Sequence, residues 1–196
     1  MIQSALELIR GRLNAFLGSA DPAADGWAVL ANIVDHEGRP FSGAENKIVM
    51  FVGNIEYDTT MSTPGRTAQR TGSVYTAVAA PRYINLSVMF FANFYNQRYA
   101  DGLDMLSRTI SFFQQSPRFT HDSDPKLDPA IERLTLEMVN LDLTQLNYVM
   151  SMIGSKYLPM VCYKLRMIPF SADTIQAIVP AARAVAAPAD GDEDGN

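Results

Sequence analysis

The chain has 196 residues, 47% hydrophobic and 19% charged, which is typical of a globular protein that can bury a core without a metal or a disulfide. Cys162 is the single cysteine, so no internal disulfide can form, and a net charge of −5 without a basic cluster argues against a nucleic-acid partner. No apolar run is long enough to span a bilayer and no basic region precedes an apolar block at the N-terminus, so we expect neither membrane insertion nor a signal peptide.

The first quarter of the chain predicts one helix and two strands. Apolar residues recur at steps of three and four over residues 2–17, which indicates an amphipathic helix, and Gly18 is expected to end it. Residues 27–34 are short and apolar, which favours a strand. Residues 47–57 form a clearer strand with apolar side chains on both sides. This pattern indicates burial on both faces, or one face against a neighbouring subunit.

The middle of the chain combines a long irregular segment with regular elements. Residues 58–80 show no periodicity, and a loop of that length in a compact domain is usually functional or disordered. Strict alternation over residues 83–94 predicts a strand, and residues 96–115 have the spacing of an amphipathic helix. Residues 117–129 contain three prolines and are expected to be irregular.

Three further elements follow. Residues 131–141 predict a strand with alternating apolar positions. Residues 144–153 predict a short helix that is capped by Thr144 and ended by Gly154. Residues 160–168 alternate sharply between charged and apolar side chains, which indicates a strand with one solvated face.

The C-terminal part carries a weaker signal. Residues 175–185 suggest a helix that Pro180 interrupts, and residues 186–196 are rich in alanine, glycine and acid, a composition typical of disorder. The sequence therefore predicts an α+β fold in residues 1–172, with a four- to five-stranded, mostly antiparallel sheet and helices mainly on one face. Residues 173–196 are expected to form a largely disordered acidic extension.

Few residues suggest catalysis. His36 and His121 both fall in predicted loops, and Cys162 lies inside a predicted strand, where a small buried hydrophobe is the ordinary interpretation. No G-x-S-x-G elbow and no glycine-rich phosphate loop is present. We therefore expect no enzymatic activity, no catalytic residues and no cofactor.

An acidic loop raises the question of a metal. Asp122, Asp124 and Asp128 offer several oxygen ligands within a short segment, as hard cations require. The glycine and the closing glutamate of a calcium-binding loop are missing, however. A solvated loop without a metal is the favoured interpretation.

Basic and aromatic side chains offer candidates for an assembly interface. Arg66, Arg70 and Arg82 lie in or beside the long segment 58–80, where they either keep a loop soluble or meet an acidic partner surface. The full set of predicted interface residues is Tyr57, Arg66, Arg70, Tyr75, Arg82, Lys164 and Arg166.

Three blocks of sequence resemble a known protein family. The first covers residues 46–49 and 52–56, and the second covers residues 85–94. The third extends from residue 112 to 166 and includes Pro117-Arg118-Phe119, Leu127-Asp128-Pro129 and Gly154-Ser155-Lys156-Tyr157-Leu158-Pro159. Together they resemble the N-terminal domain of the tail-terminator, or cap, proteins of extracellular contractile injection systems of the antifeeding-prophage and virulence-cassette type.

The resemblance implies a structural, non-enzymatic protein with a tail-terminator-like fold. Such a protein would form a homo-oligomeric ring, expected to be a hexamer, on the distal end of the inner tube, and would bind the last layer of the sheath. It would assemble in the bacterial cytoplasm as part of a phage-tail-like particle.

Other functions stay open at this point. A different ring component of the same particle, such as a tube or baseplate-adaptor protein, would share much of this sequence pattern. A small-molecule-binding module or a hydrolase would need a concave pocket with titratable groups, for which the sequence offers few residues.

Overall fold

The computed structural model describes residues 1–20, 26–59, 66–71, 74–79, 82–170 and 175–180. The chain forms two units that are interleaved in sequence. The first comprises Met1–Ser62 and Arg82–Phe170, and the second comprises Thr63–Pro81 and Ser171–Asn196.

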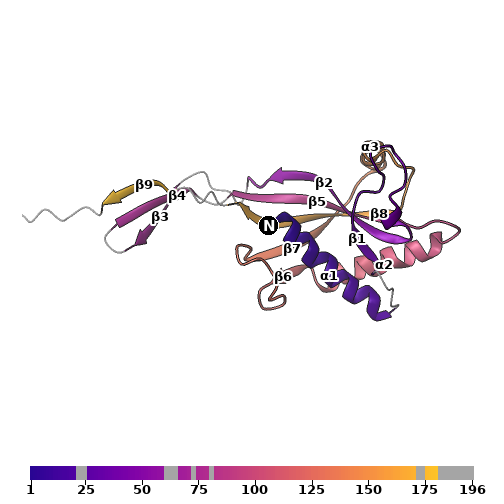
Figure 1. The fold of residues 1–196 in the computed structure, drawn as a ribbon, viewed down its shortest axis with the longest axis horizontal. Helices are drawn as coiled ribbons and strands as arrows, with labels where there is room; N and C mark the ends of the chain where they lie inside the picture. Colours follow the sequence, from indigo (N-terminus) through magenta and orange to yellow (C-terminus); the bar gives the residue numbers. More distant parts are fainter. Residues whose placement is uncertain (21–25, 60–65, 72–73, 80–81, 171–174, 181–196) are drawn as a thin grey trace, which may run out of the picture. The chain divides into compact units, whose positions relative to one another are not determined.

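The first unit is built on a six-stranded sheet (Figure 1), with strand order β1-β2-β5-β8-β7-β6. Its strands are β1 (Ala28–Leu30), β2 (Lys47–Tyr57), β5 (Arg82–Asn93), β6 (Arg118–Thr120), β7 (Arg133–Val139) and β8 (Met160–Phe170). Its helices are α1 (Ile2–Ala20), α2 (Tyr99–Gln115), α3 (Leu143–Ile153) and the short 3₁₀ turn η1 (Ser42–Ala44). β1 runs parallel to β2, and every other neighbouring pair in this sheet is antiparallel.

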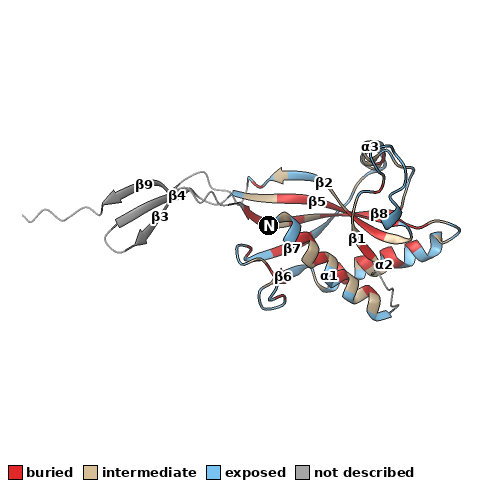
Figure 2. Cartoon of the chain, in the orientation of Figure 1, coloured by how far each residue is buried: buried red, intermediate tan, exposed pale blue. Residues whose placement is uncertain are grey.

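Each face of the sheet carries its own hydrophobic core. One core joins the sheet to α1 and α2 and contains Ile48, Met50 and Phe90. The other joins the opposite face to α3 and contains Val49 and Phe91. Because successive residues of a strand point to opposite faces, a strand that is buried on both sides reads as a continuous apolar run. This explains the apolar character of β2, and the buried middle of the sheet is red in Figure 2.

Aromatic rings fill the core beneath the two long helices. The ring centroids of Phe113 and Tyr163 lie 4.8 Å apart, and those of Phe90 and Phe113 lie 5.0 Å apart. Tilted and edge-on arrangements at these distances add to the stabilisation that comes from burial alone. The cluster fixes α2 against β5 and β8, the two central strands.

The second unit is a three-stranded antiparallel sheet. β3 (Arg66–Thr71) pairs with β4 (Val74–Ala79), and β4 pairs in turn with β9 (Ile175–Pro180). Two predictions were wrong here. The segment expected to be a loop contains two strands, and the expected helix 175–185 begins with a strand. The strand at 175–180 was missed because its partner β4 lies about a hundred residues earlier in the sequence, which local periodicity cannot reveal. β3 and β4 are neighbours in sequence, and their segment lacks the apolar alternation that would mark a hairpin.

The α+β class and the mostly antiparallel sheet with helices mainly on one face are confirmed, with six strands in the main sheet in place of the four or five expected.

α1 continues to Ala20 because Gly18 does not adopt the left-handed conformation that would end it. The cap of α3 is Asp142, not Thr144, and it exchanges side-chain and backbone hydrogen bonds with Gln145. Gly154 closes α3 in the left-handed region, as predicted. The boundary at residue 172 and the disorder of residues 186–196 remain predictions, because these positions lie outside the described residues.

Candidate assembly surface

The outer edge of β2 is open along its second half. β1 is only three residues long and pairs with Ile48–Met50, whereas β2 continues to Tyr57. Among the described strands, none pairs with β2 on its outer side beyond Met50. Ile55 and Tyr57 are 56% and 48% exposed in this stretch. An unpaired strand edge of this kind presents backbone N–H and C=O groups to any further strand.

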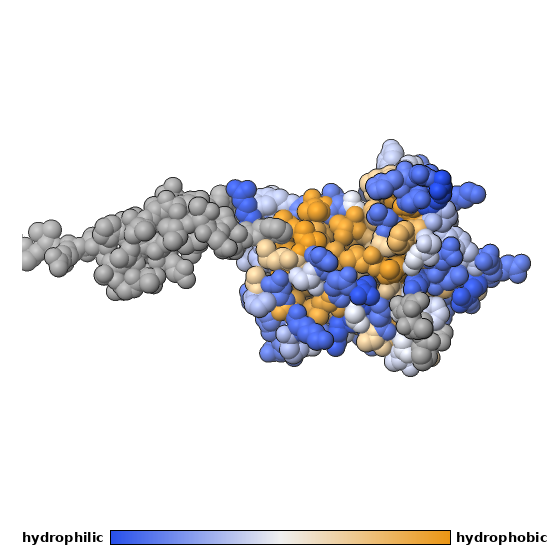
Figure 3. Space-filling view, in the orientation of Figure 1, coloured by the Kyte–Doolittle hydropathy of each residue, from blue (hydrophilic) through white to orange (hydrophobic). Residues whose placement is uncertain are grey.

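One face of this edge is apolar. Ile55 lies opposite Leu86, whose side chain belongs to the core beneath α1 and α2, so Ile55 projects from the helix-bearing face. Val52 and Ile84 are partly buried against the same core. In Figure 3, apolar side chains gather in the middle of the unit between hydrophilic ends. The helices therefore cover this face incompletely towards β2.

The other face carries two ion pairs. The Nζ atom of Lys164 lies 2.9 Å from a carboxylate oxygen of Glu56, and the Nε atom of Arg166 lies 2.9 Å from a carboxylate oxygen of Glu137. The hydrogen bond from Lys164 lowers the pKa of Glu56 below its ordinary value, against the opposing effect of desolvation. Lys164 and Arg166, both predicted from sequence, are thus brought together on the half of this sheet face that is rich in polar residues.

Two further predicted residues meet at the end of β2. The guanidinium carbon of Arg82 lies 6.0 Å from the centroid of the Tyr57 ring, a cation–π distance. Tyr57 is the last residue of β2 and Arg82 is the first residue of β5. The contact holds both exposed side chains at the same corner of the sheet.

The remaining predicted residues belong to the second unit. Arg70 pairs with Tyr75 across β3 and β4, and Arg66 lies four residues before Arg70 in β3. Because alternate positions of a strand share a face, the three register positions fall on one face of the small sheet.

A groove beside α3 was not predicted. It has a volume of about 450 Å³, and its lining includes Leu143, Met150 and Tyr157. A second hollow of about 220 Å³ adjoins it, since Leu146 and Tyr157 line both. Leu143 and Tyr157 are 84% and 62% exposed, which is unusual for large apolar side chains.

The sequence contains a signal for an exposed apolar surface on α3. The apolar stripe predicted for the helix, at Leu146, Val149, Met150 and Ile153, suffices to pack it on the sheet. Three large side chains lie outside that stripe and are exposed, namely Leu143, Tyr148 and Met152. A short helix with more apolar surface than its packing needs indicates a contact with another molecule.

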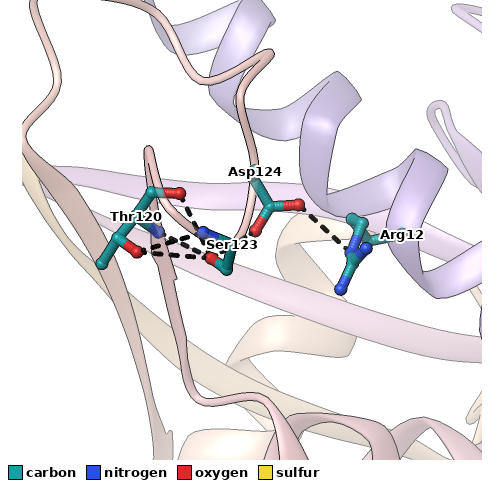
Figure 4. Close-up of polar contacts among 4 residues, drawn as sticks. All are labelled: Arg12, Thr120, Ser123 and Asp124. Atoms are coloured by element: carbon teal, nitrogen blue, oxygen red, sulfur yellow. Dashed lines mark hydrogen bonds and ion pairs between the residues drawn. The ribbon is translucent and has the colours of Figure 1, made fainter.

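Two carboxylates of the acidic loop bind the first helix. The buried carboxylate of Asp124 lies 3.2 Å from Nε of Arg12 and accepts a hydrogen bond from Ser123 (Figure 4). Asp128 accepts a hydrogen bond from Ser4 and lies 3.9 Å from the N-terminal ammonium group. No group of His, Cys, Asp and Glu side chains in the described part of the chain has the arrangement of a metal site. These carboxylates fix the loop to α1.

The single cysteine lies in an environment that disfavours reactivity. Cys162 is buried in β8, and burial raises the pKa of its thiol, which disfavours the reactive thiolate.

Within the residues that the structure places, no helix combines the length and apolar character that crossing a membrane demands. The exposed features of the first unit are therefore an edge, an ion-paired face and an apolar groove, all suited to contacts with other proteins.

Comparison with known proteins agrees with this picture. Residues 5–184 match the family described as the Pvc16 N-terminal domain. The sheath/tube terminator, in the extended state, of an extracellular contractile injection system called PVC has a similar structure, with a TM-score of 0.67 and 12% identity over 100% of this chain. The tube-terminating cap of the anti-feeding prophage is similar as well, with a TM-score of 0.63 and 12% identity over 93% of this chain.

The lengths of these proteins differ from that of this chain. The alignments cover 65% and 59% of the two matched chains, so this chain spans less than two thirds of either. A search of curated proteins found no significant match. The family match includes most of the sequence and confirms the resemblance found in its three blocks, so this chain belongs to the Pvc16 N-terminal domain family.

Proposed function

We propose that this protein is a structural cap of a contractile injection particle, a ring that ends growth of the inner tube and contacts the last sheath layer. The family match over residues 5–184, joined to a shared fold with two terminator proteins, carries the proposal. Its parts are a homo-oligomeric ring, expected to be a hexamer, with tube and sheath proteins as partners. Assembly would take place in the bacterial cytoplasm.

The physics of termination fits the exposed features of the first unit. A tube grows because each ring offers a surface that fits the next ring, a contact that never closes on itself. A cap must match the last ring on one side and offer no such match on the other. It therefore needs one permanent docking surface, and permanent interfaces are rich in apolar side chains at their centre.

The groove beside α3 is the best candidate for that docking surface. Leu143 and Tyr157 are exposed at its rim, and an apolar side chain of the last tube or sheath ring would bury both. The free strand edge of β2 and the ion-paired face lie on separate parts of the same unit, which leaves them available for a different contact.

A test uses particles from cells that lack the gene for this chain. Loss of a cap predicts tubes or sheaths of uncontrolled length in electron micrographs, which wild-type protein restores to a uniform length. A double variant, Leu143→Glu with Tyr157→Ser, should fold but fail to restore it. Tyr99→Ser is the matched control, because Tyr99 is 57% exposed on α2, away from the groove.

Two results would contradict the proposal. Particles of normal length without this chain would exclude a terminator. Particles that lack a tube or baseplate altogether would point to another ring component, the main alternative that the sequence leaves open.

A further inference from the structure

The six-stranded sheet ends in two edges that are each only half occupied. On one side β1 covers Ile48–Met50, and no other described strand lies outside the rest of β2. On the other side β6, also three residues long, pairs with Arg133–Thr135 at the start of β7. The two edges belong to one sheet, so a second copy of the chain can extend the sheet by placing one edge against the other.

Strand register places an arginine on the polar face at the β6 edge. Arg118 lies opposite Thr135, which in turn lies opposite Arg166. Residues opposite one another in a sheet share a face, so Arg118 projects from the same face as Arg166. Arg118 is exposed, and no ion pair involves it among the described residues.

The same reasoning places a carboxylate on that face at the β2 edge. Lys164 lies opposite both Ser87 and Glu137, and Ser87 lies opposite Asn54 of β2. Glu56 follows Asn54 by two residues and reaches Lys164 across β5 at 2.9 Å. The two open edges therefore carry opposite charges on a common face, Arg118 at one and Glu56 at the other.

The contact point on β6 is defined by a turn. Thr120 donates its backbone N–H to Ser123 Oγ at 3.0 Å and accepts the N–H of Asp124 at 2.8 Å (Figure 4). These bonds occupy the backbone groups at the end of β6. Arg118, at the other end of this edge strand, stays available for a further strand.

We propose that copies of this chain associate head to tail, with β6 of one copy lying against the open half of β2 of the next and Arg118 beside Glu56. Strand direction reverses at each of the four antiparallel pairings between β2 and β6, so these two strands point the same way. With the polar faces of both copies on one side, β6 of one copy therefore runs parallel to β2 of the next. Self-pairing of either edge would bring two Arg118 or two Glu56 side chains together, and like charges opposite each other are destabilising. A contact between different edges repeats and closes into a ring when the rotation allows it.

The inference goes beyond the proposed function because it names the contact between copies. Disulfide trapping of the full chain tests it. Neighbouring strands of a sheet lie roughly 4.7–4.9 Å apart, so side chains on a common face of two adjacent strands come within reach of a disulfide after a small movement. A chain with both Glu56→Cys and Arg118→Cys should therefore form a ladder of dimers, trimers and larger species on a non-reducing gel after mild oxidation.

The controls separate a head-to-tail contact from other modes of association. Each single variant should stay uncrosslinked alone, whereas a mixture of the two should yield dimers. Glu56→Cys combined with Lys126→Cys should give no ladder, because Lys126 lies in the loop after β6 and outside every strand of the sheet. Wild-type chain should stay uncrosslinked because its one thiol, Cys162, is buried.

Charge exchange gives an independent measurement by light scattering. Arg118→Glu should shift the assembly towards monomers, and adding Glu56→Arg should restore it. Efficient crosslinking by either single variant, or no ladder from the double-cysteine chain at its highest soluble concentration, would overturn the proposal. Because these assays need only this chain, their failure leaves the capping function untouched, and normal particle length in a deletion strain leaves the copy–copy contact untouched.

Discussion

The ammonium group of Lys164 reaches across strand β5 to the carboxylate of Glu56, 2.9 Å away. The pair ties β8 to the part of β2 that has no outer neighbour among the described strands. A strand edge without a partner tends to fray, and a cross-strand ion pair on one face opposes fraying. The interaction therefore holds the open edge of β2 in a conformation that another strand can join.

The pair should make a small contribution to stability that depends on pH. The pKa of Glu56 is lowered in the folded protein, so its contribution is present above the ordinary value of 4.5 and is lost as pH falls through the folded-state pKa. Both side chains are partly exposed, so Glu56→Gln should cost only about 0.5 kcal/mol at pH 7. Urea unfolding at pH 7 and at pH 3, followed by the fluorescence of Trp27, measures the difference.

The low-pH measurement is the decisive one. As pH falls towards 3, the cost of Glu56→Gln should shrink, because the wild-type carboxylate becomes protonated as pH passes through its lowered folded-state pKa. A Glu56→Gln cost that stays the same at both pH values would show that the side chain contributes through packing and not through its charge.

Removal of Arg12 should be more damaging than removal of an ordinary surface arginine. The side chain of Asp124 is only 3% exposed, and Arg12 is its cationic partner at 3.2 Å. Arg12→Met leaves a carboxylate that is buried without its counter-ion, which should cost about 2 kcal/mol. Arg108→Met is a matched control, because its partner Asp104 is 56% exposed, and it should cost less than about 0.5 kcal/mol. Equal effects of the two substitutions would disprove this role for Asp124.

The same substitution at two glycines should have opposite effects. Gly154 ends α3 with a φ of 72°, and a Cβ there would meet no atom within 4 Å, so Gly154→Ala should cost about 1 kcal/mol through backbone strain alone. Gly18 lies within α1 with open space around it, so Gly18→Ala should stabilise the protein by up to about 1 kcal/mol. Thermal unfolding of both variants checks the two signs, and a loss of stability at Gly18 would contradict the helical conformation assigned there.

Much of the first unit was predictable because its elements have strong local patterns. The continuous apolar run of β2 indicated burial on both faces, and the apolar residues at every second position of β5 indicated its face towards the helices. Lys164 and Arg166 were identifiable as surface residues for the same reason, since they interrupt an apolar strand at every second position. The three-residue strands β1 and β6 were overestimated or missed, because so short a pattern carries little information.

What the sequence concealed depends on distant partners. β4 pairs with the adjacent β3 and also with β9, about a hundred residues later, and nothing local in the β4 or β9 segment indicates that second pairing. Glu56 was not among the predicted interface residues, because its role comes from Lys164 two strands away. Arg118 likewise becomes notable only once register places it on the same face as Arg166.

Cys162 should be almost unreactive until the protein opens. Burial raises the pKa of its thiol above the ordinary value of 9.0, so the neutral form stabilises the folded state below that value and this contribution is lost as pH rises through the folded-state pKa. Burial slows alkylation at pH 8 in two ways, because it keeps the thiol protonated and because it excludes the reagent. Iodoacetamide should therefore label the native protein more than about a hundredfold more slowly than the urea-unfolded chain, which corresponds to an opening free energy of at least about 3 kcal/mol. Labelling of the native chain at a rate close to that of the unfolded chain would show that β8, a central strand of the main sheet, opens freely, and the sheet described here would then be too unstable to bind a second copy through its edges.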